Sequence, residues 1–240
     1  MLRTLNLVKR AGFTLLLLLI VSAQTGSSPG PMAHSRPETI NEEEKPLYEQ
    51  LELAELGLRK SVFEKAVKGL QKLAKTNRIK RDAVLSIADM SQSANSKRLY
   101  VIDLAQKIVL FNTYVSHGRN SGEEFARSFG NKPQSYKSSL GFYATGNCYQ
   151  GAHGLSLRLQ GLETGINHKA EQRGIVIHGA DYVSESFIEK YGRLGRSQGC
   201  PAVPAGECEP IVNTIKEGTC FFVFYPDSNY FRRSLICSNR

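Results

Sequence analysis

The sequence predicts a mainly β domain with short helices, folded as a sandwich or a barrel-like sheet and preceded by a small helical hairpin. Two observations support this class. From about residue 84 onward, apolar residues recur with the two-residue period of strands, whereas the helical period is concentrated in residues 46–78. The strands also do not alternate with long helices, so we expect mostly antiparallel pairing.

The first 23 residues have the features of an export signal. Three cations precede an apolar run over residues 11–21, and the small residues that follow suit a signal peptidase. Because a stable membrane-spanning helix needs about 20 apolar residues, we expect cleavage and no lasting membrane insertion, with an uncleaved anchor as the alternative. Residues 24–45, rich in Gly, Ser and Pro, are expected to form a flexible linker. Export would place the protein in the periplasm or the cell wall.

The predicted helical hairpin covers residues 46–78. Pro46 opens a first run in which leucines between residues 47 and 58 keep a rough helical period. The second run places apolar side chains between residues 62 and 74 on one face and lysines on the other. Ser61 is expected to cap this second helix because a glutamate follows three positions later.

The segments that follow have the composition of strands, with two helical interruptions. Residues 105–107 form a hairpin turn between two of the strands. The predicted strands are 85–88, 99–104, 108–115, 139–145, 155–159, 174–178 and 220–225, and the predicted helices are 184–191 and 208–216.

Composition and charge exclude several classes of protein. A hydrophobic content of 41% with 22% charged residues excludes a collagen-like, wholly disordered or multi-span membrane protein. The formal net charge is +9, and a positive excess remains after the predicted signal is removed. This charge suits an anionic polymer such as cell wall, although solubility alone would also explain it. No basic run is interleaved with aromatic residues, so we expect no nucleic-acid partner.

The five cysteines leave at least one thiol unpaired in an oxidising compartment. The pairing of the others is left open by the sequence. No Cys-x-x-Cys pair occurs, and the interval from Cys200 to Cys208 does not suit a zinc site, so no metal is expected.

The residues that carry chemistry lie between 174 and 204. His178 follows a buried-strand run and precedes Gly179, where a substrate can approach the backbone. Cys200 stands between Gly199 and Pro201, which favours a turn that presents the sulfur. The backbone amides of Gly199 and Cys200 are expected to point at a developing oxyanion. A thiol with a pKa near 8.5 needs a nearby base for attack, and His178 is the obvious candidate. Each residue alone would more simply be structural, but together they predict a cysteine nucleophile with a histidine base.

These residues resemble the His-Gly and Ser-His-Gly-Cys signature of L,D-transpeptidases with the YkuD-type catalytic domain, and most closely the murein L,D-transpeptidase branch of that superfamily. The resemblance spans about residues 80–236 and leaves the linker and helices uncovered. The similar motifs are Val101-Ile102-Asp103-Leu104, Val115-Ser116-His117-Gly118, Ser138-Ser139-Leu140-Gly141-Phe142-Tyr143, His153-Gly154-Leu155-Ser156-Leu157-Arg158-Leu159, Ile177-His178-Gly179-Ala180-Asp181-Tyr182-Val183 and Gly192-Arg193-Leu194-Gly195-Arg196-Ser197-Gln198-Gly199-Cys200-Pro201-Ala202.

The resemblance implies a mainly β catalytic domain that acts on peptidoglycan stem peptides without a cofactor. Cys200 would attack the carbonyl of the third residue of a tetrapeptide stem, and the thioester would pass to an amine of a second stem to form a 3→3 crosslink. His178 would move the proton, oriented by the backbone carbonyl of Gly179. Carbapenems would acylate Cys200. The chain departs from the signature at Gln198, where the family more often has a second histidine.

Four further residues are candidates for binding substrate or shaping the turn. Arg196 would bind a stem-peptide carboxylate or form a structural ion pair, and Ser197 would hydrogen-bond within the turn or position substrate. His153 lies in a Gly-bounded loop that could reach the pocket, and Tyr182 would form a cleft wall or pack in the core.

Two alternatives to transpeptidation stay open. The same nucleophile would give a murein L,D-carboxypeptidase or endopeptidase if water received the acyl group, because the acceptor is selected by pocket shape and water exclusion. A non-catalytic wall-binding module would result if Cys200 were oxidised or bridged to Cys208. A papain-like protease is disfavoured because its Cys precedes its His in the chain.

Overall fold

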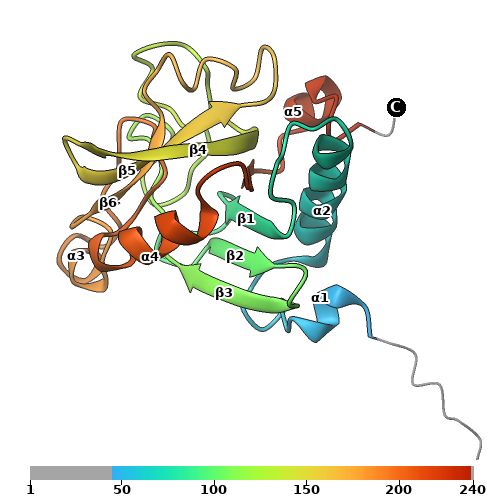
Figure 1. Cartoon of the computed structure of the whole chain (residues 1–240). Helices are drawn as coiled ribbons and strands as arrows, with labels where there is room; N and C mark the ends of the chain where they lie inside the picture. Colours follow the sequence, from blue (N-terminus) through green and yellow to red (C-terminus); the bar gives the residue numbers. More distant parts are fainter. Residues whose placement is uncertain (1–44, 239–240) are drawn as a thin grey trace, which may run out of the picture. The chain divides into compact units, whose positions relative to one another are not determined.

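The computed structural model describes residues 45–238, so the predicted signal peptide and all but the last residue of the predicted linker lie outside the described residues. Eight strands are present in this part of the chain. They are β1 (Val84–Asp89), β2 (Leu99–Asp103), β3 (Ile108–Thr113), β4 (Gly141–Gly151), β5 (Gly154–Gly161), β6 (Val176–Ala180), β7 (Ala202–Pro204) and β8 (Cys220–Phe224). All eight belong to one sheet in the order β3-β2-β1-β8-β4-β5-β6-β7. Figure 1 labels β1 to β6. The predicted mainly β class is confirmed.

The pairings are mostly antiparallel, as predicted. Five neighbouring pairs are antiparallel, and only β1–β8 and β6–β7 are parallel. The β1–β8 pair joins the first three strands to the rest of the sheet, because β8 also pairs with β4. The β6–β7 pair lies at the opposite end of the sheet from β3 and is the pair that builds the site described below.

The predicted helical hairpin needs correction. Its first helix, α1 (Leu47–Gln50), is a single turn, and only the second, α2 (Lys60–Lys75), is long. The leucines after α1 that become buried are Leu51, Leu53 and Leu58, whose spacing does not fit one face of a helix. The predicted Ser61 cap is also wrong: Arg59 occupies the N-cap position, and no side-chain bond caps the helix.

Helix α2 packs on the sheet through its apolar face. Val62, Phe63, Ala66, Leu70 and Leu73 are buried in the same core as the side chains of β1 and β8. This helix contacts β1 and β8, so it covers the part of the sheet where the two halves join (Figure 1). The helical segment is therefore part of the domain core and not a separate appendage.

The remaining helices are short. They are α3 (Glu185–Tyr191), α4 (Ala205–Ile215) and α5 (Ser228–Arg233). The first two confirm the predicted interruptions, whereas α5 and the three-residue strand β7 were not predicted. Helix α4 packs against β5, β6 and β7 and so supports the end of the sheet that carries the site. No helix in residues 45–238 is long and apolar enough to span a membrane.

Candidate active site

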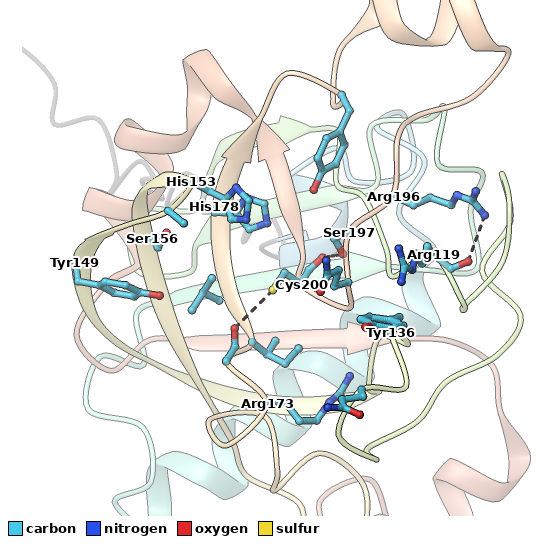
Figure 2. Close-up of a pocket in the computed structure, with 17 residues that line it drawn as sticks. Arg119, Tyr136, Tyr149, His153, Ser156, Arg173, His178, Arg196, Ser197 and Cys200 are labelled. Carbon is cyan, nitrogen blue, oxygen red and sulfur yellow. Dashed lines mark hydrogen bonds between the residues drawn. The ribbon is translucent and has the colours of Figure 1, made fainter.

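Strands β6 and β7 bring His178 and Cys200 into one pocket. His178 lies within β6, where it pairs with Ser156 of β5 on one side and with Ala202 of β7 on the other. Cys200 stands two residues before Ala202, so the parallel β6–β7 register places it beside the strand that carries the histidine. Both residues line a pocket of about 550 Å³ (Figure 2). The sequence predicted a strand that ends at His178, but β6 continues to Ala180, so the histidine lies inside the strand.

The Cys200 thiol is half-buried at the base of this pocket. Its Sγ lies 3.8 Å from the carbonyl oxygen of Gly174, to which it donates a weak hydrogen bond (Figure 2). Burial raises the pKa of the Cys200 thiol above its ordinary value of 9.0, while the backbone at Val176 and the charge of Arg173 oppose this rise. The resting form at neutral pH is therefore the thiol.

The imidazole of His178 is oriented by its own strand. Its Nδ1 lies 2.9 Å from the carbonyl oxygen of Gly179, which is the contact that the family resemblance implied. This bond assigns the ring proton to Nδ1 and leaves Nε2 as the acceptor. Burial lowers the pKa of His178 below its ordinary value of 6.5, and the neighbouring His153 ring lowers it further. Within the described residues no hydrogen bond joins His178 to Cys200.

His153 reaches the pocket from the turn between β4 and β5. Its ring stacks on that of His178 with the centroids 4.7 Å apart, and the two rings overlap in Figure 2. The side chain of His153 is exposed, and it lines the pocket as the sequence suggested it could. Tyr182, the other candidate for a pocket wall, also lines the pocket, and burial raises its pKa to about 12.

The turn before Cys200 is closed by Ser197. Its Oγ donates to the Cys200 carbonyl at 2.6 Å and accepts from the Gly199 amide at 3.0 Å. The Gly199 amide, which was predicted to face the oxyanion, donates its N–H to this hydroxyl inside the turn. The Cys200 amide donates to no other described residue and is the remaining backbone donor at this position. Gly199 itself has a φ of +122°, and a Cβ there would lie 2.8 Å from the Lys137 carbonyl.

The signature turn is fastened to residues 116–119, which run beside it. The Ser197 amide donates to the His117 carbonyl, and the Arg119 amide donates to the Ser197 carbonyl, at 3.0 and 2.8 Å. The Ser116 amide donates to the carbonyl of Ala202 in β7. Two motifs about 80 residues apart in the sequence thus form one unit.

The buried side chain of Arg98 supports the segment 116–119 that is bonded to the signature turn. Arg98 is fully buried, and its guanidinium donates to the carbonyls of Gln92 and Val115 and to Nδ1 of His117, the last at 2.8 Å. Nε2 of His117 lies 3.3 Å from the Gly122 carbonyl, so both ring nitrogens are used. Burial lowers the pKa of His117 to about 4, and the adjacent Arg98 charge acts in the same direction.

Three arginines line the pocket, and only one of them was expected. Two roles were predicted for Arg196, a structural ion pair or binding of a stem-peptide carboxylate. In the structure it forms an ion pair with Glu123 at 2.6 Å. Arg119 and Arg173 were not predicted, since neither belongs to a motif that signals chemistry by itself. Arg119 lies over the ring of Tyr136 with its Cζ 4.0 Å from the centroid.

The described residues contain no group of three His, Cys, Asp or Glu side chains that could hold a metal ion. All five cysteines lie in this part of the chain and are free thiols. The bridge between Cys200 and Cys208 that a non-catalytic module would use is not formed. The Cys208 thiol instead donates to the carbonyl of Leu155 at 3.5 Å.

Comparison with known families identifies the domain that carries this pocket. The model of the L,D-transpeptidase catalytic domain matches residues 54–224. The chain belongs to this family. The match begins before α2, whereas the sequence resemblance started at about residue 80. The L,D-transpeptidase domain therefore includes the helix that packs on β1 and β8.

Three solved structures illustrate the relationship. The LD transpeptidase LdtMt1, solved in complex with imipenem, has 15% identity and a TM-score of 0.37, with 59% of each chain covered. L,D-transpeptidase 3 from Mycobacterium tuberculosis has 14% identity and a TM-score of 0.39, with 60% of this chain and 61% of that chain covered. The helical cell shape determining protein Pgp2 from Campylobacter jejuni has 16% identity and a TM-score of 0.39, with 70% and 59% covered. The chain thus spans about three fifths of each of these proteins. A comparison with curated proteins finds no match.

Proposed function

We propose that the protein is an exported L,D-transpeptidase that transfers a peptidoglycan stem peptide through a thioester on Cys200. The observation that carries the proposal is the parallel β6–β7 pairing, which brings His178 and Cys200 into one pocket in a chain of the L,D-transpeptidase family. The nucleophile, the base, the 3→3 linkage and export are all parts of this proposal.

The first half-reaction forms the thioester. Nε2 of His178 takes the thiol proton while Sγ of Cys200 attacks the carbonyl carbon of the third stem residue. The negative charge that develops on the carbonyl oxygen is stabilised by the Cys200 amide. Collapse of this intermediate breaks the C–N bond, and His178 returns the proton to the leaving amine of D-alanine.

The second half-reaction regenerates the thiol. An amine of a second stem attacks the thioester, and His178 transfers the proton from that amine to the departing sulfur. The resting pair is a neutral imidazole and a protonated thiol, since burial lowers the pKa of His178 and raises that of Cys200. The thiol proton must therefore be transferred to His178 during the reaction for Cys200 to attack.

The reaction is tested with purified disaccharide-tetrapeptides and protein lacking residues 1–23, with the products analysed by mass spectrometry. Crosslinked dimers are expected. Tripeptide monomers would indicate an L,D-carboxypeptidase instead of a transpeptidase. An unchanged substrate would contradict both activities and favour a non-catalytic wall-binding module. The N-terminal sequence of the exported protein tests cleavage after residue 23.

The nucleophile is tested separately with imipenem. One covalent adduct per chain is expected, and peptide mapping should place it on Cys200. The Cys200→Ala variant should form no adduct and show no turnover, whereas Cys148→Ala is the matched control because Cys148 lies on β4 outside the pocket. An adduct in Cys200→Ala, or one mapped to another cysteine, would overturn the assignment.

A further inference from the structure

The wall of the pocket around Cys200 carries several cationic side chains and no acidic one among the described residues. Arg119, Arg173 and Arg196 line it together with the imidazoles of His153 and His178. Among the described residues, no aspartate or glutamate lines this pocket. A site of this kind attracts an anionic group on a ligand.

Two of the three arginines are already occupied by the protein. Arg196 donates to the carboxylate of Glu123 at 2.6 Å, which Arg193 also contacts at 3.0 Å, and to the backbone carbonyl of Gly122. The guanidinium of Arg173 donates to four acceptors in the loop that precedes β4. These are the carbonyls of Gly130 and Lys137 and the hydroxyls of Ser135 and Ser139. Neither guanidinium is free to turn toward a ligand without breaking such bonds.

Arg119 differs from both. Its side chain is exposed, lies over the Tyr136 ring and donates no hydrogen bond to any residue between 45 and 238 (Figure 2). It forms no ion pair with a carboxylate in the same range. A guanidinium whose contact with the protein is an aromatic ring keeps its N–H groups available for two parallel hydrogen bonds to a carboxylate.

The two loops that hold this pair are fixed to each other. The Asn120 amide donates to the Tyr136 carbonyl, and the Asn120 side chain donates to the Ser135 carbonyl, at 3.1 and 3.0 Å. Gln134 and Tyr136 both have left-handed backbones, with φ of +57° and +52°, which non-glycine residues rarely adopt. At Gly118, a Cβ would lie 2.4 Å from the Tyr136 carbonyl, so the loops approach as closely as glycine permits.

We infer that Arg119, seated on Tyr136, is the carboxylate-binding subsite of this pocket, and that it selects donor peptides carrying a free carboxylate beside the carbonyl presented to Cys200. The inference rests on the proposed function for the identity of the peptide. The carboxylate has two possible sources, the C-terminus of the leaving residue and an acidic side chain on the donor. Amidation of that carboxylate would remove the charge that Arg119 binds.

The test measures binding separately from catalysis. Full-length protein carrying Cys200→Ala is titrated calorimetrically with a tetrapeptide stem as the free acid, as its C-terminal carboxamide and as its side-chain carboxamide. We expect one of the two amides to bind about 10- to 100-fold more weakly than the free acid, and the weaker one identifies the source. Adding Arg119→Met should abolish the preference, and Arg119→Lys should keep part of it. Arg127→Met is the matched control, because Arg127 is also an exposed arginine but does not line the pocket.

The outcomes separate this subsite from the proposed reaction. A preference that survives Arg119→Met overturns the subsite while transpeptidation in the parent still stands. A preference that Arg119→Met removes supports the subsite even if the parent shows no turnover, in which case the proposed reaction fails alone. Absence of binding by all three peptides overturns the subsite. A urea unfolding midpoint equal to that of Cys200→Ala shows that the variant carrying both Cys200→Ala and Arg119→Met is still folded.

Discussion

Two buried imidazoles lie on opposite sides of the signature turn, and they differ in how their nitrogens are used. In both residues, His117 and His178, burial lowers the pKa. In His117, Nδ1 bonds to the buried Arg98 and Nε2 contacts the Gly122 carbonyl, so both ring nitrogens have a hydrogen-bond partner. The ring of His178 uses only Nδ1, and its Nε2 bonds to no other described residue.

The difference shows that burial alone does not assign a chemical role to a histidine. His117 has no nitrogen that can accept a proton from a substrate or a nucleophile, and its contacts hold residues 116–119 against the turn. His178 is also buried, but it lines the pocket, and its Nε2 has no hydrogen-bond partner among the described residues. A free ring nitrogen facing a cavity distinguishes the candidate base from the positioning residue.

The largest expected effect comes from removing the candidate base. His178→Gln should lower the rate of Cys200 acylation by imipenem by about 10²- to 10⁴-fold, because a general base typically contributes that much. The loss should fall mainly on the rate constant at saturation, since His178 is assigned to proton transfer. Rates are measured by mass spectrometry of the adduct over time.

The control for this variant is Gln198→His, which restores the commoner signature. It should change the rate much less, because the thiol already has a base in His178. If His178→Gln reacts as fast as the parent, the pair is wrong and His153, which stacks on it, becomes the next candidate.

A smaller effect is expected when the support of His117 is removed. Arg98→Met leaves the carbonyls of Val115 and Gln92 without their buried donor, so the free energy of unfolding should fall by about 3 kcal/mol. Urea unfolding measures this loss. Acylation should slow less than in His178→Gln, because the side chains that react are untouched. An unchanged unfolding midpoint would show that Arg98 does not support the turn.

The smallest effect is a shift in the pH profile of acylation. A protonated His178 cannot take the thiol proton, so the rate should fall as pH drops through its pKa. Because that pKa is lowered, the midpoint should lie below 6.5, and thiolate should accumulate only above 9.0. Rates with imipenem from pH 4 to 10 give the profile. The acid limb should disappear in His178→Gln, and its persistence there would assign the limb to another group.

The local pattern of the sequence was sufficient to predict the fold class, most of the strands and the two central residues of the site. Strand periodicity predicted the mainly β class and most strands, because alternation of apolar side chains is set by the strand itself. The order of His178, Gly179 and Cys200 was sufficient to select the two residues that share the pocket. The length of α1 was overestimated, because the leucines that follow it keep a rough helical period although the helix ends at Gln50. The strand β7 has only three residues, which is too short to show a period.

Which arginine is free could be decided only by the tertiary structure. Arg119 and Arg196 both stand in glycine-containing loops, and the sequence favoured Arg196 because it adjoins the signature. Glu123 forms an ion pair with Arg196, whereas Tyr136, 17 residues further along the chain, contacts Arg119 through its ring and carries no opposing charge. The same holds for the Gly199 amide, which is consumed by a hydrogen bond inside its own turn. Charge and hydrogen-bonding capacity belong to a residue in any sequence, but what remains available to a ligand depends on which partners the fold has already supplied.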